Sequence, residues 1–176
     1  MLLRQYSIRV VPYQLIWDGV TYLDGIDITP QVFYERFATS ATYPTTAQPT
    51  PASFLEAYRA ALKEAEQVVS IHVSERLTTA LRVARLAAQQ VAAERIHIVD
   101  THTAAAAEGF VVLAAARAAA EGHSAEKVIA AAEACIPRIG LLFTLETLEH
   151  LRRGGRIGQA ALLLGARLNV QPVMAV

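Results

Sequence analysis

Short apolar segments rich in β-branched residues alternate along the chain with longer segments in which apolar residues recur every three or four positions. The short segments are apolar on both faces, which is typical of strands that helices cover on both sides. Five such strands are predicted, at 8–16, 68–73, 96–99, 141–144 and 170–176. The alternation indicates an α/β fold in which a parallel sheet is sandwiched by helices.

Two of the helical segments carry clear start signals. Thr29-Pro30 and Thr50-Pro51 each place a hydroxyl at the capping position and a proline in the first turn. We expect a helix after each of them and three further helices, over 78–92, 104–121 and 125–135. Alanine is concentrated in these segments, and its small side chain allows a helix to pack closely on a sheet.

The composition excludes several classes of protein. The chain has 176 residues, enough for one ordinary domain, and 53% of them are hydrophobic, which excludes a disordered chain. Its 16 Lys and Arg balance 16 Asp and Glu, so it lacks the surplus positive charge on which general nucleic-acid binding depends. Cys135 is the single cysteine, which excludes a disulfide framework and a cysteine-rich metal site.

Neither a membrane span nor a signal peptide is predicted. The most apolar long stretch, 103–120, is interrupted by Glu108 and Arg117 and consists mostly of alanine. The first residues, MLLRQYSIRVV, lack the small-residue cleavage site of a signal peptide. We therefore expect the protein in the cytoplasm.

A stretch rich in threonine and proline, 39–51, separates strand-like from helical segments. In α/β proteins such loops lie at the carboxyl edge of the sheet, where ligand-binding groups collect. Thr45, Thr46 and Gln48 offer hydroxyls and an amide there. The same residues equally fit a turn that caps the following helix.

Two further loops follow predicted strands in the same way. Ser74 and Thr78 precede a predicted helix, where hydroxyls and free N–H groups favour a carboxylate or phosphate, although plain N-capping explains them as well. Asp100 and His102 follow the strand IHIV, and Asp100 is either a catalytic carboxylate or an acceptor for loop amides.

The string Gly154-Gly155-Arg156 follows the segment LEHLRR. Consecutive glycines after a helix permit a positive φ and a tight turn. The turn projects Arg156, whose guanidinium can hold a carboxylate, a phosphate or a facing aspartate. A structural ion pair and an anion site therefore both remain open for Arg156.

Together these segments resemble one family, the DegV family of fatty-acid-binding proteins. The resemblance rests on five strings that follow the order of the family's motifs: VVPYQLIWDGVTYLDGIDIT, PTTAQPTPASF, SERLTTALRVA, HIVDT and TLEHLRRGGRIG. Its most specific parts are Tyr22-x-Asp24-Gly25 and Gly154-Gly155-Arg156-Ile157, and it runs from about Ile8 to the end of the chain.

The resemblance implies a Rossmann-like first domain joined to a second domain, with a long-chain fatty acid such as palmitate or oleate in a tunnel between them. It implies a carrier rather than an enzyme, with no further cofactor, that presents the carboxylate of the acid to a separate fatty-acid kinase. By motif position, Thr46 and Thr78 meet the carboxylate, and Arg156 lies near the headgroup or the kinase. Ser74 completes the predicted binding set.

Four positions depart from the family's motifs. Ala47 and Glu75 stand where the family has serines, Thr79 where it has glycine, and Ala80 where it has threonine. Several hydroxyls and one conformationally free position are therefore missing. The β-branched Thr79 is expected to hinder the approach of a carboxylate to the backbone.

The family's opening strand, with its Asp-Ser-Thr motif, is expected before residue 1, and most of its second domain is expected after Val176. The chain is therefore interpreted as an α/β first domain without its opening strand at 1–150, followed by the beginning of an incomplete second domain at 151–176. The apolar residues at 160–164 and 168–174 either line a half-open lipid groove or pair two copies of the chain in a homodimer.

Two alternative functions stay open. A small esterase or phosphotransferase would use Ser74 or Asp100 with His102, although the chain has no Gly-x-Ser-x-Gly elbow, Walker loop or His-x-x-x-His spacing. The other alternative is a degenerate DegV-like subunit with an assembly role, in which the losses at Ala47 and Thr79 have abolished lipid binding.

Overall fold

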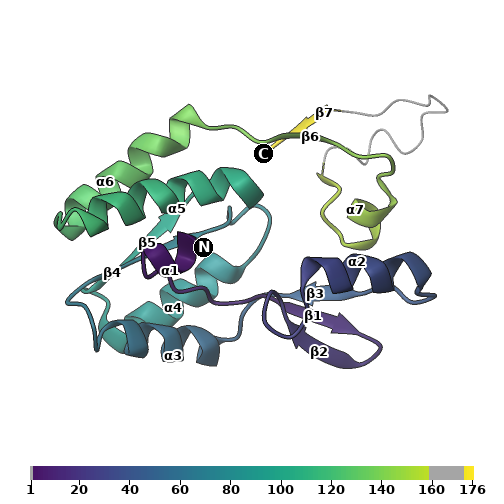
Figure 1. Cartoon of the computed structure of the whole chain (residues 1–176), viewed down its shortest axis with the longest axis horizontal. Helices are drawn as coiled ribbons and strands as arrows, with labels where there is room; N and C mark the ends of the chain where they lie inside the picture. Colours follow the sequence, from purple (N-terminus) through teal and green to yellow (C-terminus); the bar gives the residue numbers. More distant parts are fainter. Residues whose placement is uncertain (1, 159–172) are drawn as a thin grey trace.

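The computed structural model describes residues 2–158 and 173–176, which form a larger α/β body, a smaller lobe and a two-stranded ribbon (Figure 1). The larger body contains two strands and four helices: β4 (Val68–His72), β5 (Ile96–Asp100), α3 (Pro51–Ala61), α4 (Ala80–Ala92), α5 (Ala105–Ala120) and α6 (Ala125–Cys135). The smaller lobe contains β1 (Gln14–Trp17), β2 (Val20–Leu23), α2 (Pro30–Thr39) and β3 (Thr45–Ala47). The ribbon pairs β6 (Leu142–Thr144) with β7 (Val173–Ala175). The short elements are α1 (Leu2–Gln5), η1 (Ile136–Arg138) and α7 (Glu149–Arg153).

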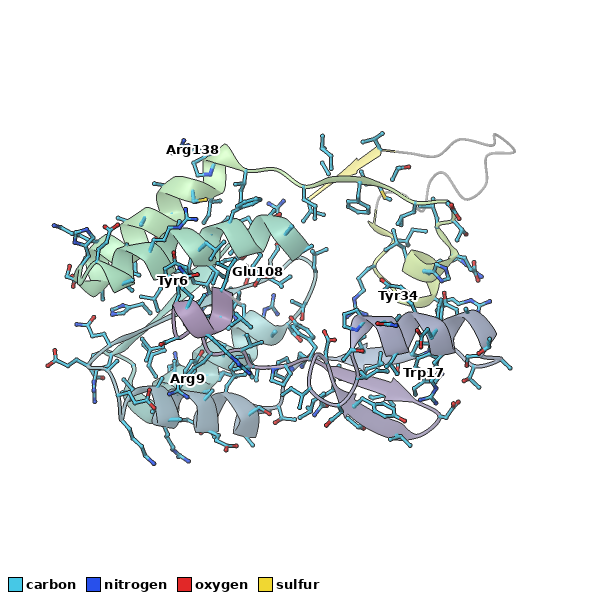
Figure 2. All side chains as sticks on the ribbon, viewed as in Figure 1. Tyr6, Arg9, Trp17, Tyr34, Glu108 and Arg138 are labelled. Atoms are coloured by element: carbon cyan, nitrogen blue, oxygen red, sulfur yellow. The ribbon has the colours of Figure 1, made fainter. Side chains whose placement is uncertain are left out.

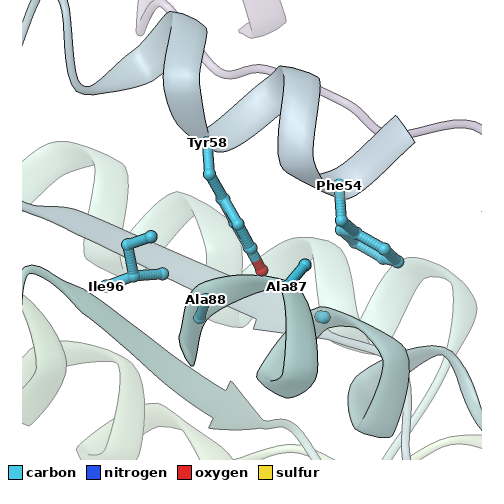
Figure 3. Packing of buried hydrophobic residues seen from close by; sticks show 6 residues of the cluster. Phe54, Tyr58, Ala87, Ala88 and Ile96 are labelled. Carbon is cyan, nitrogen blue, oxygen red and sulfur yellow. The ribbon is translucent and has the colours of Figure 1, made fainter. Parts of the chain in front are cut away.

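Helices cover both faces of the parallel β4–β5 pair. On one face, Phe54 and Tyr58 of α3 and the buried alanines of α4 pack around Ile96 (Figure 3). On the other face, Val99 packs beneath α5 and α6, which meet largely through buried alanine side chains. The predicted α/β class, with a parallel sheet between layers of helices, is confirmed by this arrangement.

The helices begin where their local signals predict. The hydroxyl of Thr29 accepts a hydrogen bond from the N–H of Val32, and the hydroxyl of Thr50 accepts one from the N–H of Ser53. These contacts satisfy N–H groups that the first turn of a helix leaves without partners. The helix predicted at 78–92 begins at Ala80, because Thr78 and Thr79 belong to the preceding loop.

The smaller lobe is built around Trp17 (Figure 2), which is fully buried. Asp18 and Gly19, with φ of 53° and 77°, form the tight turn that folds β2 back antiparallel on β1. β3 pairs antiparallel with the other edge of β1. Phe33 and Phe37 of α2 pack against the indole, with ring centroids 5.4 and 6.2 Å away.

The strand predicted at 8–16 and its place in the parallel sheet are wrong. The strand begins at Gln14, and β1 belongs to an antiparallel sheet with order β2-β1-β3. Pro12 lacks the N–H that a ladder requires, and the turn at Asp18 and Gly19 returns the chain at once. The strand predicted at 141–144 is also misplaced, because β6 pairs antiparallel with β7 and not with β4 or β5.

Several predictions concern residues outside those that the structure describes. They are the apolar segment 160–164, residues 168–172 of the second apolar segment, and the start of the strand at 170–176. The predicted domain boundary at 150 falls within α7 and stays a prediction. Among residues 2–158 and 173–176, no helix is both long and apolar enough to cross a bilayer.

A partly buried chain of hydrogen bonds crosses the α3–β4 interface. The hydroxyls of Tyr58 and Ser70 lie 2.9 Å apart, and the Ser70 hydroxyl lies 2.8 Å from Nε2 of His72. Phe54 packs against the imidazole, with ring centroids 5.7 Å apart. Burial lowers the pKa of His72 from 6.5 to about 4, although nearby Asp100 acts in the opposite direction.

We expect the free energy of unfolding to fall by about 3 kcal/mol between pH 6.5 and pH 4 because of His72. The unfolded chain takes up a proton on this side chain throughout that interval, whereas the folded protein begins to do so only near pH 4. His72→Gln keeps a polar partner for Ser70 without titrating, and should remove this component. Urea unfolding of both proteins across the interval measures the difference. Parallel pH profiles for the two proteins would contradict the expectation.

Candidate functional site

A cavity of about 170 Å³ lies where the smaller lobe meets the larger body. Its walls come from the segment before β1, from β3, from the β4–α4 loop and from the turn after α7. The lining residues are Tyr13, Thr46, Ala47, Gln48, Val73, Leu77, Thr78 and Arg156. Three of the four predicted ligand-binding residues, Thr46, Thr78 and Arg156, therefore line one cavity.

The Thr78 hydroxyl is oriented as a hydrogen-bond donor. Its Oγ1 accepts from the hydroxyl of Tyr13 at 3.1 Å and from the N–H of Ala80 at 3.2 Å. A hydroxyl oxygen has two lone pairs, so both are in use and its proton is left for another acceptor. Burial raises the pKa of Tyr13, although its bond to Thr78 opposes the shift, and this keeps the phenol protonated as a donor.

Thr46 lies on β3, opposite Leu15 of β1. Its side chain is exposed, and no hydrogen bond within residues 2–158 and 173–176 uses its hydroxyl. The neighbouring loop is fixed by Gln48, whose Oε1 accepts from the hydroxyl of Thr79 at 2.8 Å. This bond joins the β3–α3 loop to the β4–α4 loop, so the segments of Thr46 and Thr78 are tied together.

Thr79, where the resemblance predicts glycine, adopts its backbone conformation without strain. Its φ is −90°, a value that any residue adopts, so this position does not require glycine. The predicted loss of conformational freedom therefore has no structural cost here. Its hydroxyl instead supplies the contact to Gln48.

Arg156 reaches the cavity from the turn that ends α7. Gly155 has a φ of 70°, which favours glycine, and the N–H of Arg156 donates to the carbonyl of Leu151 at 2.9 Å. Nη1 of Arg156 donates to the carbonyl of Gly154 at 2.6 Å. The guanidinium is also close enough to Tyr13 to lower its pKa, against the larger effect of burial. Arg156 therefore supplies positive charge at the cavity.

Ser74 is not among the lining residues. It is buried, and its hydroxyl oxygen accepts from the N–H of Arg76 at 3.3 Å. Asp100 accepts from the N–H of His102 at 2.8 Å and from the N–H of Glu75 at 3.4 Å. These contacts match the structural alternative for Asp100, an acceptor for loop amides. A hydrolase or phosphotransferase would pair Ser74 or Asp100 with His102. The described residues show no hydrogen bond between Ser74 and His102, whereas Nδ1 of His102 lies 3.3 Å from Oδ2 of Asp100. Neither Asp100 nor His102 lines the cavity.

Tyr13 is the functional candidate that sequence reasoning missed. It lies in the segment predicted as strand interior, and its partner Thr78 is 65 residues away. The pattern around Tyr13 therefore carries no local signal of this role. Val73 and Leu77 were missed for the same reason, and they supply an apolar wall to the cavity.

Glu108, in the first turn of α5, has a pKa that burial raises to about 7, and its charge raises the pKa of Tyr13. Burial disfavours the charged carboxylate, so the contribution of Glu108 to the free energy of unfolding is complete below about pH 4.5 and is lost as the pH rises through 7.

Glu108→Gln should therefore stabilise the protein by about 1 kcal/mol at pH 8, after discounting for partial exposure, and leave it unchanged at pH 4. Thermal unfolding at both pH values tests this; equal gains at both would contradict it.

A family model described as "Uncharacterised protein, DegV family" matches residues 1–176, the whole chain. The chain belongs to the DegV family. A DegV domain-containing protein from Deinococcus radiodurans is 39% identical over 166 residues, which cover 94% of this chain and 59% of the relative. The chain thus spans about three fifths of the length of this DegV relative.

Solved DegV structures share the fold. A fatty-acid-binding DegV family protein from Thermus thermophilus superimposes with a TM-score of 0.89 at 40% identity, over 99% of this chain and 62% of that one. DegV of Bacillus subtilis, described as a fatty acid binding protein, gives a TM-score of 0.88 at 29% identity over the same shares. The predicted family and the fold are therefore confirmed.

Proposed function

We propose that this chain binds a long-chain fatty acid such as palmitate or oleate and holds its carboxylate at the cavity of Thr46, Thr78 and Arg156. The observation that carries the proposal is the convergence of two hydroxyls and a guanidinium from three separate segments on one cavity. The fatty-acid-binding names of the Thermus thermophilus and Bacillus subtilis relatives support the same ligand class.

The chemistry of the cavity suits a carboxylate. Thr78 has a proton to donate, Thr46 has an unused hydroxyl among the described residues, and Arg156 contributes positive charge. Hydrogen bonds to a charged group contribute about 1.5–3 kcal/mol each. We keep Ser74 as a support of the β4–α4 loop, because its buried hydroxyl accepts from a loop N–H.

The size of the cavity suits the headgroup rather than the whole lipid. Its volume of about 170 Å³ is below the range of about 300–1,000 Å³ that is usual for small-molecule sites. We propose that the acyl tail leaves it past Val73 and Leu77. Burying about sixteen methylenes at about 0.8 kcal/mol each would supply about 13 kcal/mol, so affinity depends on how much of the tail is covered.

The bound acid would be presented to a partner, and the proposed partner is a fatty-acid kinase that phosphorylates the carboxylate. In this role the chain is a cytoplasmic carrier that needs no cofactor and catalyses no reaction itself. The proposal includes a homodimer, in which a second copy of the chain covers the tail. Light scattering with and without oleate tests that part.

Mass spectrometry of organic extracts from the purified protein tests the proposal directly. We expect a co-purified long-chain acid, and after delipidation we expect oleate to raise the melting temperature. At a concentration one hundred times the dissociation constant, the stabilisation is about 2.7 kcal/mol. Methyl oleate, which lacks the charge, is the matched control and should give a smaller shift. Extracts without an acid, together with no shift from oleate, would refute lipid binding.

A further inference from the structure

An aromatic stack joins α7 to the smaller lobe. The rings of Tyr43 and His150 stack with centroids 5.3 Å apart and planes 24° apart. Phe37 of α2 packs edge-on against both rings, with centroids 5.3 Å from Tyr43 and 5.7 Å from His150. The guanidinium of Arg153 lies 4.8 Å from the centre of the Tyr43 ring. Figure 1 shows α7 lying over α2, where these contacts form.

The orientation of Arg153 is itself fixed. The carboxylate of Glu149 accepts from Nε of Arg153 at 2.7 Å and from Nη2 of Arg152 at 2.8 Å. One acid therefore holds both arginines along α7, and Arg153 is left with its guanidinium over the Tyr43 ring. Cation–π contact of this kind adds to the ring stacking.

The stack connects two walls of the candidate site. Tyr43 lies three residues before Thr46, which lines the cavity from β3. His150 lies on α7, and the bond from the N–H of Arg156 to the carbonyl of Leu151 fixes Arg156 to the end of that helix. A displacement of α7 from Tyr43 would therefore carry Arg156 away from Thr46.

We propose that Tyr43 is a positioning residue, which holds Arg156 at the headgroup cavity by docking α7 through His150 and Arg153. The tests of this proposal that measure oleate affinity rest on the proposed fatty-acid site. Tyr43 acts through other residues, because it is absent from the lining of the cavity. The ring, rather than the hydroxyl, makes the contacts with His150 and Arg153.

Oleate affinity of the delipidated full chain provides the first test. Tyr43→Ala should weaken binding about tenfold, which is the scale of one aromatic pair. Tyr43→Phe keeps the ring and should stay within twofold of the parent. Tyr34→Ala is the matched control, because Tyr34 is an exposed aromatic of α2 that packs on Phe33 outside the stack. Unchanged affinity in Tyr43→Ala would overturn the proposal.

A double-mutant cycle separates positioning from general destabilisation. If Tyr43 acts through Arg156, then Tyr43→Ala should cost no further affinity once Arg156→Ala is present. The preference of the protein for oleate over methyl oleate should fall in both single variants, because both lose the same charge contact. Additive losses in the double variant would show that Tyr43 acts independently of Arg156, against the proposal.

A measurement without ligand tests the docking by itself. Spin labels at Glu35→Cys on α2 and Arg152→Cys on α7, in a Cys135→Ser background, report the distance between the two helices. We expect a narrow distribution with Tyr43 or Tyr43→Phe and a broad one with Tyr43→Ala. A narrow distribution in Tyr43→Ala would refute the docking role. A parent protein that does not bind oleate would refute the proposed function, and these distances would still decide whether Tyr43 docks α7.

Discussion

The double variant Thr46→Val/Thr78→Val is expected to bind oleate at least about 100-fold more weakly than the parent protein. Valine has nearly the shape of threonine but lacks the hydroxyl, so each substitution removes one donor to the carboxylate. At about 1.5–3 kcal/mol for each hydrogen bond to a charged group, the two losses give at least about 3 kcal/mol. A factor of ten in affinity corresponds to about 1.4 kcal/mol, which gives the expected ratio.

Titration calorimetry with delipidated protein measures this ratio. Thr45→Val is the matched control, because Thr45 is an exposed neighbour on β3 that does not line the cavity. Its affinity should match that of the parent. The Thr78→Val substitution also removes the acceptor of the Tyr13 hydroxyl, so thermal unfolding must accompany the titration. A folded double variant with parental affinity would refute the assignment of the two threonines to the headgroup.

Trp17→Ala is expected to lower the free energy of unfolding by about 3–5 kcal/mol, which is usual for a buried aromatic replaced by alanine. The side chain is fully buried beneath Phe33 and Phe37, and its Nε1–H is within hydrogen-bond distance of the hydroxyl oxygens of Ser40, at 3.2 Å, and Thr42, at 3.1 Å. The variant leaves a cavity at the centre of the smaller lobe and removes the donor to these two hydroxyls.

Urea unfolding followed by far-ultraviolet circular dichroism measures this loss, because the variant has no tryptophan for fluorescence. Tyr34→Ala changes an exposed aromatic on the same lobe and should cost about 0.5 kcal/mol or less. A loss below about 1 kcal/mol for Trp17→Ala would show that the lobe does not depend on its indole. Such a result would also contradict the idea that the core around Trp17 positions β3, which carries Thr46.

The smaller lobe positions a part of the candidate site. Asp18 accepts from the hydroxyl of Thr42 at 2.6 Å and from Arg36 at 2.8 Å, and the Arg36 guanidinium lies 4.3 Å from the centre of the Trp17 ring. These contacts fix the segment that leads from α2 into β3. The position of Thr46 thus depends on the folding of the lobe around Trp17.

The site was predicted in part, and the reason differs from residue to residue. Thr46, Thr78 and Arg156 were selected by their places in motifs, and they line one cavity, although their contact with a carboxylate stays a prediction. Ser74 is predicted from its place before a helix, but its hydroxyl accepts from the N–H of Arg76 and it does not line the cavity. Tyr13 could not have been selected, because its role exists only through its contact with Thr78.

Residue patterns alone predict the elements whose causes are local. Thr29 and Thr50 cap helices because each hydroxyl bonds an N–H three residues away, and β4 and β5 are apolar runs long enough to be strands. Long-range packing places β1 in an antiparallel lobe, and it brings together at one cavity Tyr13, Thr46, Thr78 and Arg156. Those outcomes depend on contacts between segments far apart along the chain, and such contacts leave no periodic pattern in the residues that make them.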